Sequence, residues 1–315
     1  MRIFMLLLFV SCFFASCSSD DNSNLTNSNR QSLDFSEVMT FQVDTLELDM
    51  ISSDAENAFF ITYSADNGFN ESVLKYEVAT NSQTDLVHPD ISESRQIEII
   101  NDYIYSISSN DIYKFDLNLN NLSNINSSYN SAVYLRASNY NNELLYFVGN
   151  KIGRFDITSE SYNNVLSNSP YDYRDQNDGE IANDVIYMFG GRHCDSHEDF
   201  ENNTCDSFNE IAIYNIMDDS WSQEFLPYQV HESFTAINEN KILVVGNKNP
   251  DQTNSFISEY DVLTSDYTDL DTSLDLENIT IRGITVLNNE VYVAYVELVD
   301  PLPDIVTVKV VKASL

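Results

Sequence analysis

A short strand-like unit recurs along this chain and constrains its fold more than any other feature. Each copy contains an aromatic residue, then usually an acid or asparagine, then an apolar residue. The aromatic residues are Tyr76, Phe115, Phe155, Tyr214 and Tyr260. Their successive separations are 39, 40, 59 and 46 residues. Self-similarity at periods of roughly 20–50 residues is typical of solenoids, propellers and related repeat architectures.

A polar pair followed by an apolar strand forms the second recurring signal. The pairs begin at Asn101, Asn142, Asn183, Asn240 and Asn289. Polar pairs of this type suit tight turns between antiparallel strands. Since the sequence also lacks sustained helical periodicity, each repeat predicts four antiparallel strands, which is one blade of an all-β propeller.

The repeat boundaries predict six blades and one domain. The expected blades span 46–90, 91–130, 131–168, 169–227, 228–272 and 273–315. The last blade contains only three good strands, so we expect the strand-like segment 39–44 to supply the fourth and close the ring. Closure protects strand edges that an open array would expose. The expected domain is 36–315, and a seven-bladed propeller is the alternative.

The segment 183–221 resembles a kelch repeat. It has a strand that ends in Gly190 and Gly191, then a polar loop, then a strand with Tyr214 followed by Trp221. The other units carry weaker versions of this pattern. The resemblance implies a kelch-like propeller, and kelch-like folds include sialic acid mutarotases among their enzymes.

The first residues predict a targeting segment rather than part of the fold. Arg2 precedes an apolar run at 3–15 that is too short to span a membrane. The sequence Phe-Ala-Ser-Cys at 14–17 resembles a bacterial lipobox, which implies that 1–16 are removed and that Cys17 receives the lipid. An ordinary cleaved signal peptide is the alternative.

The segment 17–35 is rich in Ser, Asn, Asp and Thr, so we expect a flexible tether without a core. The residues Ser-Ser-Asp-Asp at 18–21 resemble the acidic export signal of surface lipoproteins in the Bacteroidota. The two resemblances together imply an outer-membrane protein on the cell surface, held to the membrane by its lipid anchor alone.

The formal net charge of −35 restricts the possible partners. A chain this acidic repels phosphates, which argues against nucleic acid or anionic membrane as a partner. Solubility in a salty medium is the simplest explanation of the charge. We expect a monomer that binds an extracellular glycan or an envelope protein.

Two cysteines remain beyond the expected signal and lipid site, and both lie in the insert of the fourth repeat. An even pair in an exported protein predicts a disulfide between Cys194 and Cys205. A zinc site is the alternative, because His193 and His197 flank Cys194.

Three arginines share one spacing in the repeat, ten residues before a tyrosine. The pairs are Arg95 and Tyr105, Arg136 and Tyr146, and Arg282 and Tyr292. This position falls on the expected first strand of a blade, which lines the channel in propellers. Their guanidiniums would suit a carboxylate or sulfate ligand. Arg192, which opens the cysteine loop, is a further candidate, and a chance arrangement with local salt bridges is the alternative.

Neither a metal nor a catalytic motif stands out. Acid clusters at 172/175/178 and 269/271/275 suggest Ca²⁺, but EF-hand spacing fails, so we expect solvated turn acids and no cofactor. The four histidines lie in no motif, and no nucleophile elbow or phosphate loop is present. We therefore expect a binding protein that uses its loops and channel mouth. A carbohydrate-active enzyme, mutarotase-like or lyase-like, and a structural partner of an envelope complex are the alternatives.

Overall fold

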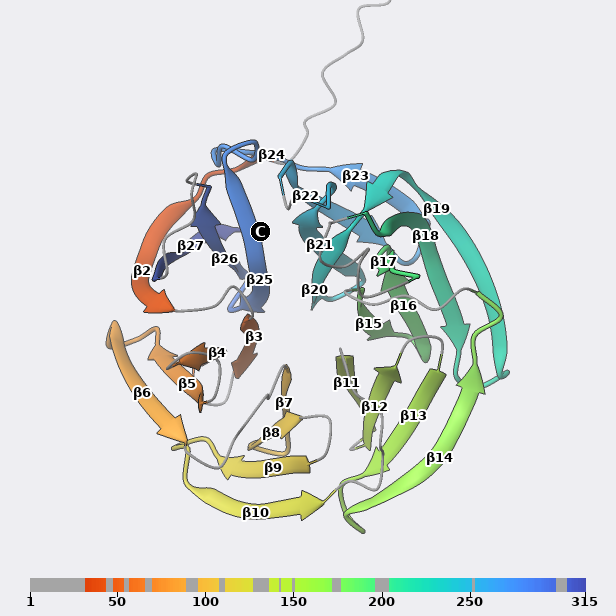
Figure 1. Ribbon diagram of the computed structural model, residues 1–315, viewed down its shortest axis with the longest axis horizontal. Coiled ribbons are helices and arrows are strands. Elements are labelled where there is room, and N and C mark those ends of the chain that lie inside the picture. The colour runs from red at the N-terminus through yellow and green to blue at the C-terminus, as the bar shows by residue number, and fades with distance from the viewer. Residues whose placement is uncertain are drawn as a thin grey trace, which may run out of the picture. The chain divides into compact units, whose positions relative to one another are not determined.

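Six small antiparallel sheets form a ring around a central channel (Figure 1). The computed structural model describes residues 32–43, 48–53, 57–65, 70–88, 96–107, 111–126, 136–141, 143–148, 151–171, 177–195, 204–250, 253–298 and 305–315. These residues contain no helix, and accordingly none that could cross a membrane. The predicted all-β, six-bladed propeller is confirmed.

Every blade contributes its first strand to the channel and its last strand to the rim. Blade one contains β3 (Leu48–Ser53), β4 (Ala58–Ala65), β5 (Asn70–Glu77) and β6 (Ser82–His88). Blade two contains β7 (Gln96–Ile100), β8 (Tyr103–Ile107), β9 (Asp111–Asp116) and β10 (Asn121–Asn126). Blade three contains β11 (Arg136–Tyr140), β12 (Glu143–Val148), β13 (Lys151–Asp156) and β14 (Ser161–Asn168). Blade four contains β15 (Asp178–Ala182), β16 (Val185–Phe189), β18 (Asp206–Asn215) and β19 (Ser220–Val230), with the short β17 (Arg192–His193) paired to β18. Blade five contains β20 (Glu232–Asn238), β21 (Lys241–Asn247), β22 (Ser255–Asp261) and β23 (Asp266–Asp269).

Blade six is closed by the N-terminal strand, as predicted. It contains β25 (Ile279–Leu287), β26 (Glu290–Glu297) and β27 (Val306–Ser314), and β2 (Ser36–Val43) pairs antiparallel with β27. Met39 and Val43 of β2 are buried in the same apolar cluster as Val308. The N-terminal strand β2 and the C-terminal strand β27 thus share one sheet. This pairing completes the fourth strand of blade six and closes the ring.

A second N-terminal contact was not predicted. The strand β1 (Ser32–Leu33) runs parallel to β24 (Asp271–Thr272), which follows blade five. Leu33 is fully buried, and the Phe35 amide donates to Ser273 Oγ at 2.9 Å. The end of the expected tether therefore belongs to the fold, because one leucine in a polar stretch supplies enough apolar surface to be held by a neighbouring strand.

The recurring aromatic residues form the packing between blades. All five lie on the third strand of their blade and are at most 6% exposed: Tyr76, Phe115, Phe155, Tyr214 and Tyr260. Phe59 stacks on Tyr76 and also contacts Tyr292 of blade six, with ring centroids 4.8 and 5.0 Å apart. The aromatic repeat thus marks the positions where one sheet packs against its neighbours.

Tight turns with positive φ join the first and second strands. Asn101 and Asp102 have φ of 50° and 62°, and Asn183 and Asp184 have φ of 51° and 62°. Two consecutive positive φ values favour Asn and Asp, as in type I′ turns. In blade six the turn residues are Asn288 and Asn289, one position earlier than the sequence pattern suggested.

The glycine of the kelch-like motif has a steric role. Gly190 has φ of +53°, and a Cβ at this position would lie 2.5 Å from Val230 Cβ. Only glycine permits this approach of the β16 end to the β19 end.

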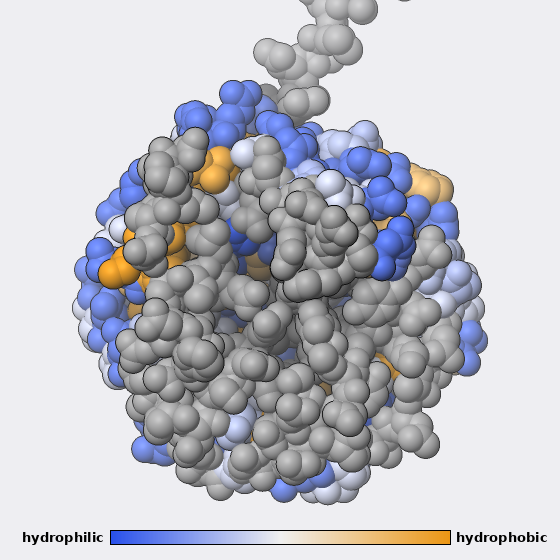
Figure 2. Space-filling view, viewed as in Figure 1, coloured by the Kyte–Doolittle hydropathy of each residue, from blue (hydrophilic) through white to orange (hydrophobic). Residues whose placement is uncertain are grey.

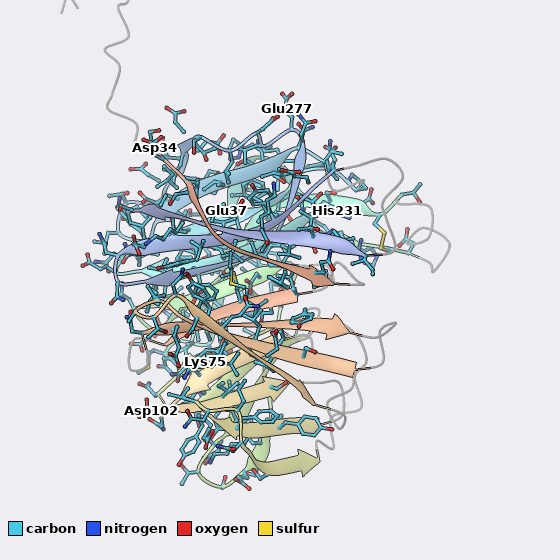
Figure 3. All side chains as sticks on the ribbon, turned by 90° about the vertical axis from the view of Figure 1, so that its left-hand side faces the viewer. Asp34, Glu37, Lys75, Asp102, His231 and Glu277 are labelled. Carbon is cyan, nitrogen blue, oxygen red and sulfur yellow. A yellow bond between two sulfur atoms is a disulfide. The ribbon has the colours of Figure 1, made fainter. Side chains whose placement is uncertain are left out.

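The two faces of the ring differ in what they carry. In the side view of Figure 3, the disulfide and His231 lie toward one face, and Asp102 lies toward the other. We call the first the disulfide face. The inner strand β20 begins next to His231 on this face, and the inner strand β7 ends beside Asp102 on the opposite face.

Candidate ligand site in the central channel

A cavity of about 260 Å³ occupies the channel, and the first strands of all six blades line it. Figure 2 views the ring along this axis, and hydrophilic residues are visible deep in a hollow near its centre. Seven residues, with at least one from every blade, supply the polar side chains of the lining: Asp49, Glu98, Asn139, Asp178, Glu180, Thr235 and Thr285. The site is therefore built on rigid strands rather than on loops.

Two aspartates link neighbouring blades in the same way. Asp49 accepts a hydrogen bond from the amide of Met50 at 2.9 Å and another from Ile97 of blade two at 3.1 Å. Asp178 accepts one from the amide of the next residue at 2.9 Å and another from Thr235 of blade five at 2.8 Å. Each carboxylate thus satisfies an amide on the inner edge of the next blade, which would otherwise be unpaired.

Two glutamates occupy equivalent positions on the first strands of blades two and four, at a different level of the channel from the two aspartates. Glu98 pairs with Tyr105 across blade two, and Glu180 pairs with Tyr187 across blade four. Because alternate residues of a strand share a face, Asp178 and Glu180 present both carboxylates on the same side of β15. Four carboxylates therefore lie at two adjacent levels of the channel.

Burial and mutual repulsion change the protonation of these glutamates. Burial, followed by the charges of Asp178 and Asp49, raises the pKa of Glu180 to about 8. Burial, followed by the charges of Glu180, Asp49 and Asp178, raises the pKa of Glu98 well above its ordinary value. Glu180 is accordingly largely protonated at pH 7.

Thr235 adds a hydroxyl group that has no hydrogen-bond partner among the described residues. The residue is 8% exposed and lines the cavity next to Asp178, to which its amide donates. A buried hydroxyl without a partner costs free energy.

Arg282 lies between blades five and six rather than among the residues that line the cavity. It is 3% exposed, and its Nη1 donates to Glu232 at 2.9 Å. Glu232 also accepts from Asn247 Nδ2 at 2.9 Å. The guanidinium is thus engaged by a buried carboxylate of its own chain.

The structure does not describe the side chains of the other two repeat arginines. Arg95 lies outside the described residues, and so does the side chain of Arg136, whose backbone begins β11. Tyr105 and Tyr292 are the third residues of their strands, whereas Tyr146 is the fourth residue of β12. The supposed equivalence of Arg136 with the other two arginines is therefore off by one residue, which changes the face on which a side chain lies. The anion site stays a prediction.

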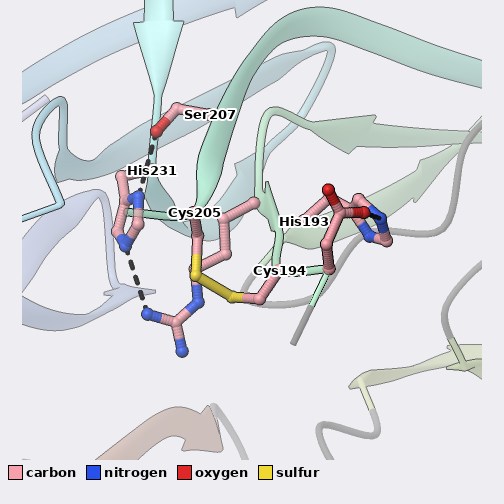
Figure 4. The surroundings of a disulfide bond; sticks show 7 residues. His193, Cys194, Cys205, Ser207 and His231 are labelled. Atoms are coloured by element: carbon pink, nitrogen blue, oxygen red, sulfur yellow. Dashed lines mark hydrogen bonds and ion pairs between the residues drawn. A yellow bond between two sulfur atoms is a disulfide. The ribbon is translucent and has the colours of Figure 1, made fainter. Parts of the chain in front are cut away.

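The predicted disulfide between Cys194 and Cys205 is confirmed, with a Cα–Cα distance of 4.5 Å (Figure 4). The cysteines are thus paired with each other and not available for the alternative zinc site. His193 contacts Asp195 at 3.1 Å, and His197 lies outside the described residues.

Arg192, two residues before Cys194, belongs to a buried polar cluster. It is 3% exposed, and its Nη1 contacts Nε2 of the fully buried His231 at 3.2 Å. Because a guanidinium only donates, Nε2 accepts, and Nδ1 carries the proton that it donates to Ser207 Oγ at 3.0 Å. The serine is therefore an acceptor and is not activated as a nucleophile by this histidine.

The acid clusters suggested for Ca²⁺ do not converge in the described part of the chain. No group of three or more His, Cys, Asp and Glu side chains there is close enough to hold a metal ion. Asp172 and Asp175 lie outside the described residues. Asp269 accepts hydrogen bonds from Tyr228 at 2.6 Å and Ser258 at 2.7 Å, and Asp275 accepts from Asn278.

Sequence reasoning missed the acidic lining of the channel. It considered Asp178 only as a member of the acid cluster at 172/175/178, and it did not consider Asp49, Glu98 or Glu180. The usable signal was the spacing of Asp178 and Glu180, two residues apart on an expected first strand, together with Glu98 at the matching position before Tyr105.

Comparison with known proteins adds no family to this description. A scan against models of protein families gives no match to this chain, and a search of curated protein sequences gives no significant match. The structural conclusion is an all-β, six-bladed propeller whose arrangement is compatible with a kelch-like propeller.

Proposed function

We propose that this protein is a lipid-anchored binding protein of the bacterial cell surface, and that it recognises an extracellular glycan in the channel of its propeller. The polar cavity of about 260 Å³ carries this proposal. A channel filled by apolar side chains would favour an envelope protein bound at an exposed face instead. The cavity is slightly below the roughly 300–1,000 Å³ of drug-sized ligand pockets, which suits a single sugar residue.

The lining has the groups that bind sugar hydroxyls. The carboxylates of Asp49 and Asp178 accept hydrogen bonds and are held in place by backbone amides of two blades. Asn139 supplies both a donor and an acceptor, and Thr285 supplies a hydroxyl. Side chains that are already oriented bind a ligand with less loss of conformational entropy.

The location is proposed from the N-terminal sequence, with Cys17 as the lipidated residue. Labelling cells with a radioactive fatty acid should mark the protein, and Cys17→Ala should abolish the label. Protease treatment of intact cells should remove the wild-type protein; survival of the protein would contradict a surface location.

The binding test is glycan-array screening of the full chain, followed by calorimetry with the best glycan. Asn139→Ala removes a channel amide and should weaken binding by at least about tenfold, or 1.4 kcal/mol. Asn118→Ala is the matched control, because Asn118 is exposed in the turn after β9 and should leave binding unchanged. Equal affinities of both variants and wild type would place the glycan outside the channel.

A carbohydrate-active enzyme is the second candidate, and the raised pKa of Glu180, about 8, favours it. A carboxyl group that is protonated near neutral pH suits a general acid. Exchange between sugar anomers, followed by NMR, would detect mutarotation. Loss of turnover in Glu180→Gln with binding retained would establish an enzyme in which Glu180 is the general acid. Absence of turnover in the wild-type protein would exclude enzymatic activity on the sugars tested.

A further inference from the structure

The residues that line the channel cavity without being buried fall into two groups of equal size. One group is aliphatic: Ile51, Ile181, Ile237 and Val286. The other is polar: Glu98, Asn139, Asp178 and Glu180. A ligand in this cavity therefore meets as many aliphatic as polar side chains.

The aliphatic group forms one continuous arc of the channel wall. Its members belong to β15, β20, β25 and β3, and these inner strands of blades four, five, six and one are neighbours in turn around the channel (Figure 1). The polar group belongs to β7, β11 and β15, the inner strands of blades two, three and four. The cavity thus has an aliphatic arc, formed by Ile51, Ile181, Ile237 and Val286, and a polar side.

Packing between blades covers only part of each aliphatic side chain. Every member of the arc packs against a different hydrophobic cluster: Ile51 between blades one and two, Ile181 between blades three and four, Ile237 between blades four and five, and Val286 between blades five and six. The part that stays exposed borders the cavity. Because apolar surface in contact with water is unfavourable, a ligand that covers the arc with an aliphatic group gains free energy.

We propose that the channel selects a 6-deoxy sugar, with the methyl group against the aliphatic arc and the ring hydroxyls toward the polar side. A hydroxymethyl group in the same place would lose hydrogen bonds to water and find no aliphatic side chain able to replace them. This inference rests on the proposed glycan site in the channel, and it names the class of sugar that the site prefers.

Calorimetry with the full chain tests the inference with two matched pairs of sugars. L-Fucose and L-galactose share one ring configuration, and L-rhamnose and L-mannose share another. Within each pair only the 6-deoxy sugar has the methyl group. The 6-deoxy member of the pair that binds should bind at least about tenfold more tightly than its counterpart. Its binding should also have the more negative heat-capacity change, since more apolar surface is buried.

Val286→Thr tests the arc itself, because it keeps a branched side chain and replaces one methyl group by a hydroxyl. It should reduce the ratio of the two affinities at least about threefold. Val38→Thr is the matched control, since Val38 is a partly exposed residue of β2 that does not line the cavity, and it should leave the ratio unchanged. The ratio compares two sugars on the same protein, so a general loss of stability in a variant does not imitate the effect.

Three outcomes would overturn the inference. They are equal affinities within each pair, a preference for the 6-deoxy sugar that Val286→Thr leaves unchanged, and failure of all four sugars to bind. Glycan binding that is weakened by Asn139→Ala but shows no preference for 6-deoxy sugars would leave the proposed glycan function intact and remove only the preference. Absence of binding to any glycan on the array would remove both.

Discussion

The guanidinium of Arg282 lies 2.9 Å from the carboxylate of Glu232, and both side chains are buried where blades five and six meet. Removing one partner of a buried pair leaves the other charge without compensation, which costs about 3–5 kcal/mol. We therefore expect Arg282→Met to lower the free energy of unfolding by this amount, measured by urea denaturation.

The double variant Arg282→Met with Glu232→Leu is the control for that experiment. It removes both charges and keeps apolar volume, so it should be clearly more stable than Arg282→Met alone. Equal stability of the single and double variants would mean that Glu232 is not left as an uncompensated buried charge.

Leu33 anchors the segment that precedes the closing strand β2. Leu33 is fully buried in the cluster formed by blades five and six. Leu33→Ala should cost about 2–5 kcal/mol, since truncation of a buried leucine loses apolar burial and leaves a cavity. Gln42→Ala, at an exposed position of β2, should stay within about 0.5 kcal/mol of wild type by thermal and urea unfolding. A similar effect of the two substitutions would show that β1 does not secure the ring.

The disulfide constrains a loop with a sequence separation of 11 residues. The chain-entropy model assigns a loop of this size about 3 kcal/mol. Replacing both Cys194 and Cys205 by serine should reduce the free energy of urea unfolding by about this amount. Added reductant should destabilise wild type and leave the double variant unchanged; an effect of reductant on both proteins would point to another cause.

The fold was predictable because its determinants are local and repeated. The five aromatic residues mark third strands. The sequence also indicated that segment 39–44 would supply the missing fourth strand of blade six, and the observed strand is β2, Ser36–Val43. The contact of Leu33 was not predictable, because its burial depends on β24, more than two hundred residues away in the sequence.

The candidate site was less predictable than the fold. One-residue differences in turn position moved Tyr146 out of register with Tyr105, and spacing alone cannot reveal such a slip. The acidic lining depends on which inner strands are neighbours across the channel, and this relation is a property of the closed ring. Glu98 and Glu180 are 82 positions apart in the sequence, yet the charge of Glu180 contributes to the raised pKa of Glu98.

The channel glutamates make stability depend on pH in a defined direction. A glutamate in an unfolded chain has a pKa near 4.3, whereas burial and neighbouring charges raise the pKa of folded Glu180 to about 8. Between these values the folded state binds more protons than the unfolded state. The contribution of Glu180 to stability is therefore complete below pH 4 and is lost as the pH rises to 8, with a slope of about 1.4 kcal/mol per pH unit in mid-range.

Urea denaturation of the full chain at several pH values between 5 and 8 measures this slope. Glu180→Gln should make the decline in stability with rising pH shallower, because glutamine does not titrate. Adding Glu98→Gln should flatten the decline further, since the pKa of Glu98 is raised in the same direction. Glu277→Gln, which is exposed, should keep the wild-type slope and so control for the overall negative charge of the chain. An unchanged slope in the double channel variant would show that the channel carboxylates do not bind the extra protons.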